Sequence, residues 1–200
     1  MPSSNTNSTK KWRPTFSTTI DPTVFNGSRP RGIINLIQGT GPTAGLFFAL
    51  AADARIHTYS SSLASLNPVT TDTYTHANMQ TNSFYVRVAL SPCGRWLASG
   101  GAAAGSAFVY DVSNAHSAST YSPHSNSAPF AGHSRGVQLR GQSGEVGAVD
   151  WAMDEGMDGM LATCADDGTV RTWRANPDVA LLCGKDPEEA KWDWAFAVGQ

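Results

Sequence analysis

The residues best suited to chemistry are acidic and lie close together in the sequence. Asp166 and Asp167 are adjacent, and Asp150 precedes them by one predicted strand. Paired carboxylates of this kind can act as general acid and base. Asp167, however, stands before Gly168 between two alternating segments, where an Asp-Gly pair forms the turn of a hairpin. The turn role is therefore favoured for Asp167. Because no nucleophile, base and orienting group converge in the sequence, we predict no catalytic residue and no enzyme.

Metal and cofactor chemistry finds no support in the spacing of the remaining candidates. His116, His124 and His133, with Cys93, fit no zinc pattern. The glycine-rich stretch 39–45 lacks the Lys-Ser or Lys-Thr ending of a phosphate-binding loop. We therefore expect no metal ligand and no cofactor-binding residue.

The elements that must position these residues are short strands. Residues 160–165 and 169–173 alternate and are joined by the turn 166–168, and the alternating stretch 144–151 precedes them. Three short strands ending in an aromatic residue are typical of one blade of a β-propeller. The predicted fold class is therefore all-β, a β-propeller of about three blades. These strands resemble those of a WD-repeat β-propeller, and the resemblance implies a larger, seven-bladed ring.

Two further segments repeat this pattern, and they divide the chain. The predicted blades lie near 31–60, 83–112 and 145–174, within a partial propeller at 31–176. A polar connection at 60–81 has room for an outer strand around 69–74. Residues 113–143 form an insertion of low periodicity, residues 1–30 a disordered segment rich in Ser, Thr and Asn, and residues 177–200 a tail.

A buried polar network is expected to fix the register of the strands. The strand-ending aromatics are Tyr59, Tyr110 and Trp173, and at the same distance before each of them stand Asp53, Ala104 and Asp167. In such a blade the Asp holds a His and, through it, a Ser or Thr and the aromatic residue. The third blade has the full set, which is His133, Thr163, Asp167 and Trp173. The second blade is predicted to be incomplete at Ala104.

Composition narrows the possible partners. The net charge is −2, with 14 basic and 16 acidic residues, so no broad electrostatic attraction to nucleic acid is expected. Three cysteines in predicted turns and strands suit reduced thiols of the cytosol or nucleus. No apolar run is long enough to span a bilayer, and residues 1–10 lack the apolar core of a secretory signal.

Two pieces of the chain resemble the denticleless family of WD-repeat proteins. The first is 82–94 with 97–100 and 108–110, and the second is 144–151 with 162–173. The stretch 32–36, with Asp53 and Tyr59, is similar to the blade before them. The Phe-Tyr-Val-Arg strand at 84–87 and the Ala-Thr-Cys-Ala-Asp-Asp strand at 162–167 carry most of this resemblance.

The resemblance implies a substrate receptor of a cullin-four-type RING ubiquitin ligase. Such a protein docks on an adaptor propeller and directs replication-licensing and cell-cycle proteins, bound to the DNA sliding clamp, to destruction in the nucleus. Adaptor docking in such receptors uses Trp-Asp-x-Arg after a third strand, and neither 110–113 nor 173–176 has it. The alternatives are a WD-repeat scaffold in chromatin or nucleic-acid processes without a ligase link, or a non-functional partial gene product.

Four residues are candidates for contact with protein partners. These are Tyr85, Arg87, Arg171 and Arg174. Exposed aromatic and arginine side chains are the usual anchors of interfaces. Arg87 is placed on an innermost strand, close to the central channel of the propeller. The alternative, solvated charges on strand faces, remains open.

Overall fold

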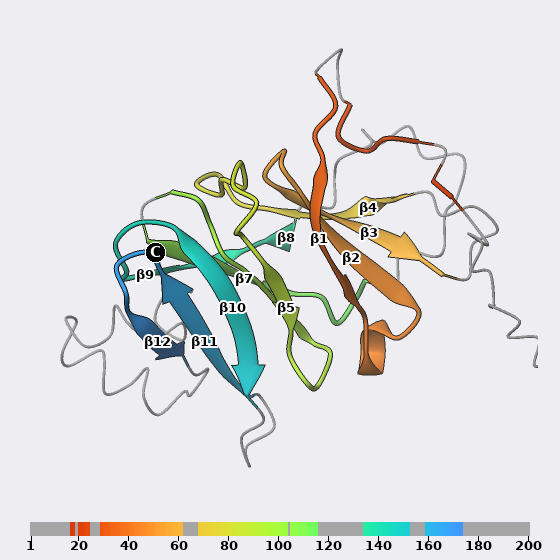
Figure 1. Cartoon of the computed structure of the whole chain (residues 1–200). Coiled ribbons are helices and arrows are strands. Elements are labelled where there is room, and N and C mark those ends of the chain that lie inside the picture. The colour runs from red at the N-terminus through yellow and green to blue at the C-terminus, as the bar shows by residue number, and fades with distance from the viewer. Residues whose placement is uncertain are drawn as a thin grey trace, which may run out of the picture.

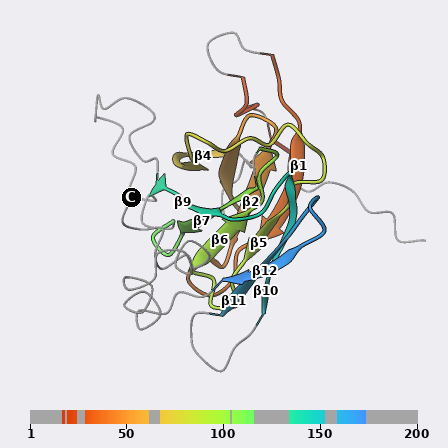
Figure 2. The ribbon, with the colours of Figure 1, turned by 90° about the vertical axis from the view of Figure 1, so that its left-hand side faces the viewer.

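A computed structural model describes residues 17–18, 20–24, 29–61, 68–103, 105–115, 134–152 and 159–173. Strands dominate this part of the chain and form three sheets, with the second sheet between the first and the third (Figures 1 and 2). The only helix among the described residues is the short 3-10 helix η1, Gly41–Thr43. In the described part of the chain, no helix has the length and apolar character needed to cross a membrane.

The first sheet holds four antiparallel strands and a short fifth strand in the order β1-β2-β3-β4-β8. Its strands are β1 Ile33–Gln38, β2 Leu46–Ala51, β3 Arg55–Ser60, β4 Pro68–Thr75 and the parallel β8 Ser134–Arg135. The outer strand predicted around 69–74 is therefore present as β4. The turn between β2 and β3 contains Ala54 at a φ of 62°, a left-handed conformation that non-glycine residues rarely adopt.

The second sheet has the strand order β5-β6-β7-β9 and differs from the prediction at both ends. Its strands are β5 Val88–Leu90, β6 Trp96–Ser99, β7 Ser106–Asp111 and β9 Val137–Arg140. The strand expected from residue 84 begins only at Val88, because residues 84–85 form a turn. Strand β9, inside the stretch predicted as an insertion, pairs with β7 and closes the outer edge of this sheet.

The third sheet is the hairpin predicted from the sequence, preceded by one more strand. Its strands are β10 Val146–Ala152, β11 Met160–Ala165 and β12 Val170–Trp173, in the order β10-β11-β12. Gly168 in the hairpin turn has a φ of 76° and donates its N–H to the carbonyl of Ala165 at 3.0 Å. Glycine meets this conformation without a steric cost.

Two apolar layers hold the three sheets together. The layer between the first and second sheets includes Phe48, Leu50, Ile56, Val86, Leu97, Phe108 and Tyr110. The layer between the second and third sheets includes Ala98, Val109, Leu139, Val146, Trp151, Leu161 and Trp173. Strand β5 contacts both β1 and β10, so the first strand of each sheet lies on the same side of the molecule (Figure 1). This is the arrangement of neighbouring propeller blades.

Candidate protein-binding face

The third sheet contains a continuous chain of hydrogen bonds that begins at its strand-ending aromatic residue. The indole Nε1 of Trp173 donates to Thr163 Oγ1 at 2.9 Å, and Thr163 Oγ1 donates to Gln142 Oε1 at 2.7 Å. Gln142 Nε2 donates to the Thr169 carbonyl at 3.0 Å, and the Thr169 hydroxyl donates to Asp167 Oδ1 at 2.6 Å. Trp173, Thr163 and Gln142 are buried, so the chain links the core to the hairpin turn.

Gln142 occupies the position in this network that the sequence analysis gave to His133. Gln142 lies in the connection between β9 and β10, directly after Gly141, whereas His133 lies outside the described residues. The amide of glutamine can accept from Thr163 with its oxygen and donate to carbonyls with its nitrogen. In the described network a neutral amide therefore connects Thr163 to the hairpin turn.

Asp167 contributes from the surface rather than from the core. Its side chain is exposed and accepts hydrogen bonds from the backbone N–H of Ser143 at 2.6 Å and of Thr169 at 2.9 Å. These hydrogen bonds hold the pKa of the Asp167 carboxyl below its usual value. The largest effect comes from the Ser143 N–H, followed by the hydroxyl and then the N–H of Thr169. Asp167 therefore joins the hairpin turn to the β9–β10 connection.

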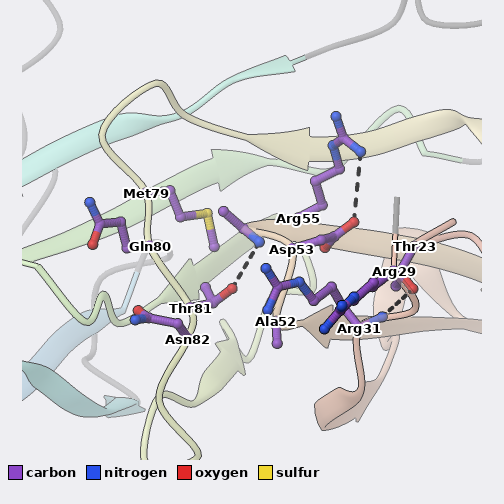
Figure 3. Close-up of a pocket in the computed structure, with 11 residues that line it drawn as sticks. Thr23, Arg29, Arg31, Ala52, Asp53, Arg55, Met79, Gln80, Thr81 and Asn82 are labelled. Atoms are coloured by element: carbon purple, nitrogen blue, oxygen red, sulfur yellow. Dashed lines mark hydrogen bonds and ion pairs between the residues drawn. The ribbon is translucent and has the colours of Figure 1, made fainter. Parts of the chain in front are cut away.

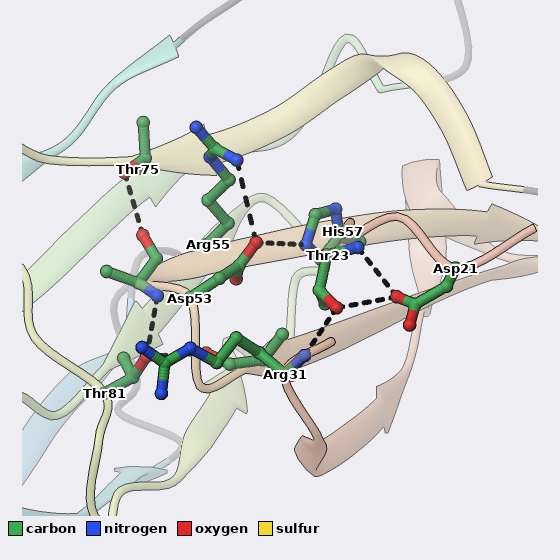
Figure 4. A network of polar contacts seen from close by, with 10 residues as sticks. Asp21, Thr23, Arg31, Asp53, Arg55, His57, Thr75 and Thr81 are labelled. Atoms are coloured by element: carbon green, nitrogen blue, oxygen red, sulfur yellow. Dashed lines mark hydrogen bonds and ion pairs between the residues drawn. The ribbon is translucent and has the colours of Figure 1, made fainter. Parts of the chain in front are cut away.

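In the first sheet the corresponding aspartate has different partners. The side chain of Asp53 is 10% exposed, and its Oδ2 lies 3.2 Å from His57 Nε2 and 3.7 Å from Arg55 Nη1 (Figure 4). In the strand pairing of the first sheet, Ala49 occupies the position that Thr163 has in the third sheet. An alanine has no hydroxyl, so this position cannot connect Asp53 to Tyr59. Burial raises the pKa of the Tyr59 hydroxyl, with a smaller effect of nearby carboxylates.

The second sheet has no aspartate-based network at its aromatic residue. The hydroxyl of Tyr110 donates to Met79 Sδ at 3.1 Å, and the Ser99 hydroxyl donates to the Gly100 carbonyl at 2.9 Å. Burial raises the pKa of Tyr110, which therefore acts as a neutral donor. Ala104 lies outside the described residues.

The turns of the sheets and the connections between the sheets meet on one face of the molecule. The Ala54 N–H donates to Thr81 Oγ1 at 2.9 Å, and the Ala102 N–H donates to the Gln80 carbonyl at 2.7 Å. The Gly105 N–H donates to the carbonyl of Gly144 at 2.6 Å. We call this surface the loop face; it consists of the turns 52–54, 100–103 with 105, and 166–168 and of the connections 76–87 and 141–145.

The most exposed apolar side chains of the loop face are adjacent. Phe84 is 79% exposed and Tyr85 is 77% exposed. Arg87 holds their turn, because its Nη1 donates to the carbonyls of Phe84 and, at 3.1 Å, of Val86. The Ser83 hydroxyl, which also accepts from the Tyr85 N–H, anchors the same turn by donating to a carboxylate oxygen of the β9–β10 connection. The aromatic pair is thus presented on an ordered turn.

Two of the four candidate contact residues lie on the same turn of the loop face. Tyr85 and Arg87 lie together on the loop face, where the Arg87 N–H also donates to the Gly147 carbonyl at 2.9 Å. Arg171 is partly buried on β12, two strands away from β10 in the third sheet. Arg174 lies outside the described residues.

A pocket of about 600 Å³ opens on the loop face (Figure 3), and its lining residue Asn82 shortly precedes Phe84 in the β4–β5 connection. Its lining comes from three segments: Thr23, Arg29 and Arg31 before β1, residues 52–55 of the β2–β3 turn, and residues 79–82 of the β4–β5 connection. The described residues contain no group of three or more His, Cys, Asp or Glu side chains that could hold a metal ion. The pocket presents the guanidinium groups of Arg29, Arg31 and Arg55 and the carboxylate of Asp53 for polar contacts.

Sequence reasoning missed several residues of this face. The alternating pattern at 84–90 predicts a strand for Phe84, and the repeat pattern predicts a histidine rather than Gln142 in the network. A glycine followed by a polar residue just after the alternating stretch 137–140 was the available signal for Gln142. Arg29, Arg31 and Arg55 carry no local pattern, because the fold alone brings them together.

Comparison with known proteins defines the class. The family described as "WD domain, G-beta repeat" matches residues 130–174, which include β9 and the third sheet. Together with the three sheets, which are arranged as propeller blades, this match shows that the chain is a WD-repeat β-propeller protein with a protein-binding role.

Within this class the sequence is similar to the denticleless proteins, as the resemblance predicted. It is 32% identical over 158 residues to the cell division cycle protein cdt2 of Schizosaccharomyces pombe, covering 78% of this chain and 27% of that protein. It is 28% identical over 151 residues to denticleless protein homolog B of Xenopus laevis, covering 76% of this chain and 18% of that protein. The chain thus spans about a quarter or less of the length of these relatives.

Solved structures with a similar arrangement include other WD-repeat proteins. U3-55K gives a TM-score of 0.49 at 17% identity, covering 73% of this chain and 37% of that chain. The WD40 repeats of RRP9 give a TM-score of 0.48 at 16% identity, covering 73% and 36%.

Proposed function

We propose that this chain acts as a non-catalytic substrate receptor of a cullin-RING ubiquitin ligase of the cullin-four type. Its partners are the adaptor propeller of the ligase and replication-licensing and cell-cycle proteins bound to the DNA sliding clamp. The similarity to proteins named cdt2 and denticleless supports this proposal, and it also favours work in the nucleus.

The observation that carries the proposal is the exposed aromatic pair of the loop face. Phe84 and Tyr85 stay out of both apolar layers although they are large. Burying a side chain of this size at an interface contributes about 1.5–3 kcal/mol, and aromatic residues are enriched among the anchors of protein interfaces. Their turn is held by Arg87 and Ser83, so little conformational entropy is lost when a partner binds.

The mechanism that follows is one of placement. The three sheets form a rigid support, and the loop face holds a segment of the substrate protein on the aromatic pair. Ubiquitin transfer is left to the enzymes that the ligase brings, since the receptor raises the local concentration of substrate near them. Arg87 is assigned a positioning role for the aromatic turn, and Arg171 and Arg174 remain candidate contact residues.

The test is affinity purification of the tagged protein, expressed from its own locus, followed by mass spectrometry. The double variant Phe84→Ser/Tyr85→Ser removes the anchors, and Leu36→Ser, which changes an exposed apolar residue of β1, is the control. We expect the adaptor propeller and replication-licensing proteins with the wild type and the control, and loss of the licensing proteins with the double variant. Recovery of chromatin proteins without a ligase subunit would favour the scaffold alternative.

A further inference from the structure

The pocket on the loop face is strongly cationic for its size. It is lined by the side chains of Arg29, Arg31 and Arg55 and by one carboxylate, that of Asp53 (Figure 3). The Oδ2 atom of Asp53 lies next to His57 and Arg55, whereas its buried Oδ1 has no hydrogen-bond partner among the described residues. No carboxylate of the described residues pairs with Arg29 or Arg31, and both residues are exposed. The pocket therefore has a surplus of positive charge.

The segment that carries two of these arginines is fixed to the sheet. The Arg31 N–H donates to Thr23 Oγ1 at 2.8 Å, and Thr23 Oγ1 donates to Asp21 Oδ1 at 2.6 Å (Figure 4). The Ala52 N–H donates to the Gly32 carbonyl at 2.9 Å. These bonds hold the backbone of Arg31 against the β2–β3 turn, so its guanidinium extends from a defined point.

The floor of the pocket is held in a single conformation. Ala54, at its positive φ, donates its N–H to Thr81 Oγ1 at 2.9 Å and accepts from Thr75 Oγ1 at 2.8 Å. Thr81 Oγ1 also donates to the Ala51 carbonyl at 2.5 Å. A left-handed alanine persists where its surroundings fix it. The backbone that forms the floor of the pocket is thus fixed by hydrogen bonds.

We propose that this pocket binds an anionic peptide segment of a partner protein, in which the negative charge comes from a phosphorylated residue or from neighbouring glutamates. Arginine guanidinium groups bind phosphate and carboxylate oxygens through paired, charge-assisted hydrogen bonds. The inference deepens the proposed function, since Thr81 and Asn82 line the pocket and the same connection continues into Phe84 and Tyr85. We assign an apolar residue of the same extended peptide, a few positions from the anionic residue, to the aromatic pair, which follows Asn82 in the same connection.

The favoured ligand is a peptide rather than a nucleic acid. The positive charge of the pocket comes from three arginines, and the chain as a whole has a net charge of −2. Nucleic-acid binding relies on a broad basic surface that contacts many phosphates.

The test is fluorescence anisotropy of the 200-residue chain with short labelled peptides. One peptide carries phosphoserine about three residues before a leucine, the second carries two glutamates in place of phosphoserine, and the third carries alanine. We expect the phosphoserine peptide, the glutamate peptide or both to bind at least about tenfold more tightly than the alanine peptide. Binding of phosphoserine alone identifies a phosphoryl site, and binding of both identifies a general anion site.

Matched variants assign the effect to the pocket. Arg29→Gln/Arg31→Gln should lower affinity for the anionic peptides about tenfold, whereas Arg95→Gln, at the opposite end of β5 where Arg95 pairs with Asp111, should not. Equal affinity for all three peptides, an equal loss in both variants, or tighter binding of a single-stranded oligonucleotide would overturn the inference. If one of these outcomes is found while the Phe84→Ser/Tyr85→Ser variant still fails to co-purify the licensing proteins, the proposed function stands and only the pocket assignment is wrong.

Discussion

Gln142 Oε1 accepts a hydrogen bond from Thr163 Oγ1 at 2.7 Å, and both side chains are buried. This contact connects the β9–β10 connection to the middle strand of the third sheet. Through Trp173 on one side and Thr169 on the other, it couples the core of the sheet to the hairpin turn. The loop face depends on this connection, because the Gly144 carbonyl accepts from the turn of the second sheet.

Substituting Gln142→Leu should therefore destabilise the chain. The change leaves the buried Thr163 hydroxyl without its acceptor, which costs about 1–3 kcal/mol, and removes one of the two donors to the Thr169 carbonyl, the other being the Ala165 N–H. Urea unfolding followed by tryptophan fluorescence measures the loss. Gln38→Leu, at the exposed end of β1, is the control and should change stability by less than about 0.5 kcal/mol. Equal stability of the Gln142 variant and wild type would show that the network contributes nothing.

Thr81→Val should weaken the floor of the pocket. The methyl group that replaces the hydroxyl cannot accept from the Ala54 N–H or donate to the Ala51 carbonyl. The expected loss of unfolding free energy is about 1–3 kcal/mol, together with weaker binding of the anionic peptides. Thr172→Val, exposed on β12, provides the matched control by thermal unfolding and anisotropy. A fully stable Thr81 variant would contradict the assigned role of this hydroxyl.

Acid should remove the contribution of Asp167 to stability. Its pKa in the folded chain lies below the usual value because of the hydrogen bonds from Ser143 and Thr169. The folded state therefore favours the carboxylate, so the stabilisation is complete above the unfolded pKa of about 4 and is lost as the pH falls through the folded pKa. The difference in unfolding free energy between wild type and Asp167→Asn should shrink in that window. A difference that stays constant into strong acid would refute this account.

The sequence predicted most of the sheets because their local signals agree. The hairpin at 160–173 combines alternation with an Asp-Gly turn, and both features depend only on neighbouring residues. The alternation at 84–90 was misleading, because period alone cannot show whether an extended stretch has a strand partner. The N–H of Arg87 donates to Gly147 in the next sheet, and Phe84 and Tyr85 turn outward.

The missed features depend on contacts between distant segments. Strand β9 has only four residues in a polar stretch, and it can be recognised as a strand only from its pairing with β7. The pocket joins Arg31, Arg55 and Thr81 from three parts of the chain. No local pattern marks such residues, whereas Thr163 and Trp173 follow the repeat and could be predicted.

The most direct test of the central claim is the half-life of a replication-licensing protein through S phase in cells of the source organism. The cells carry the wild-type protein, the Phe84→Ser/Tyr85→Ser variant or the Leu36→Ser control at equal abundance. A receptor that holds substrates on its loop face predicts rapid, proteasome-dependent loss with the wild type and the control, and a stable protein with the double variant. The same rapid loss in all three cell lines would contradict the claim.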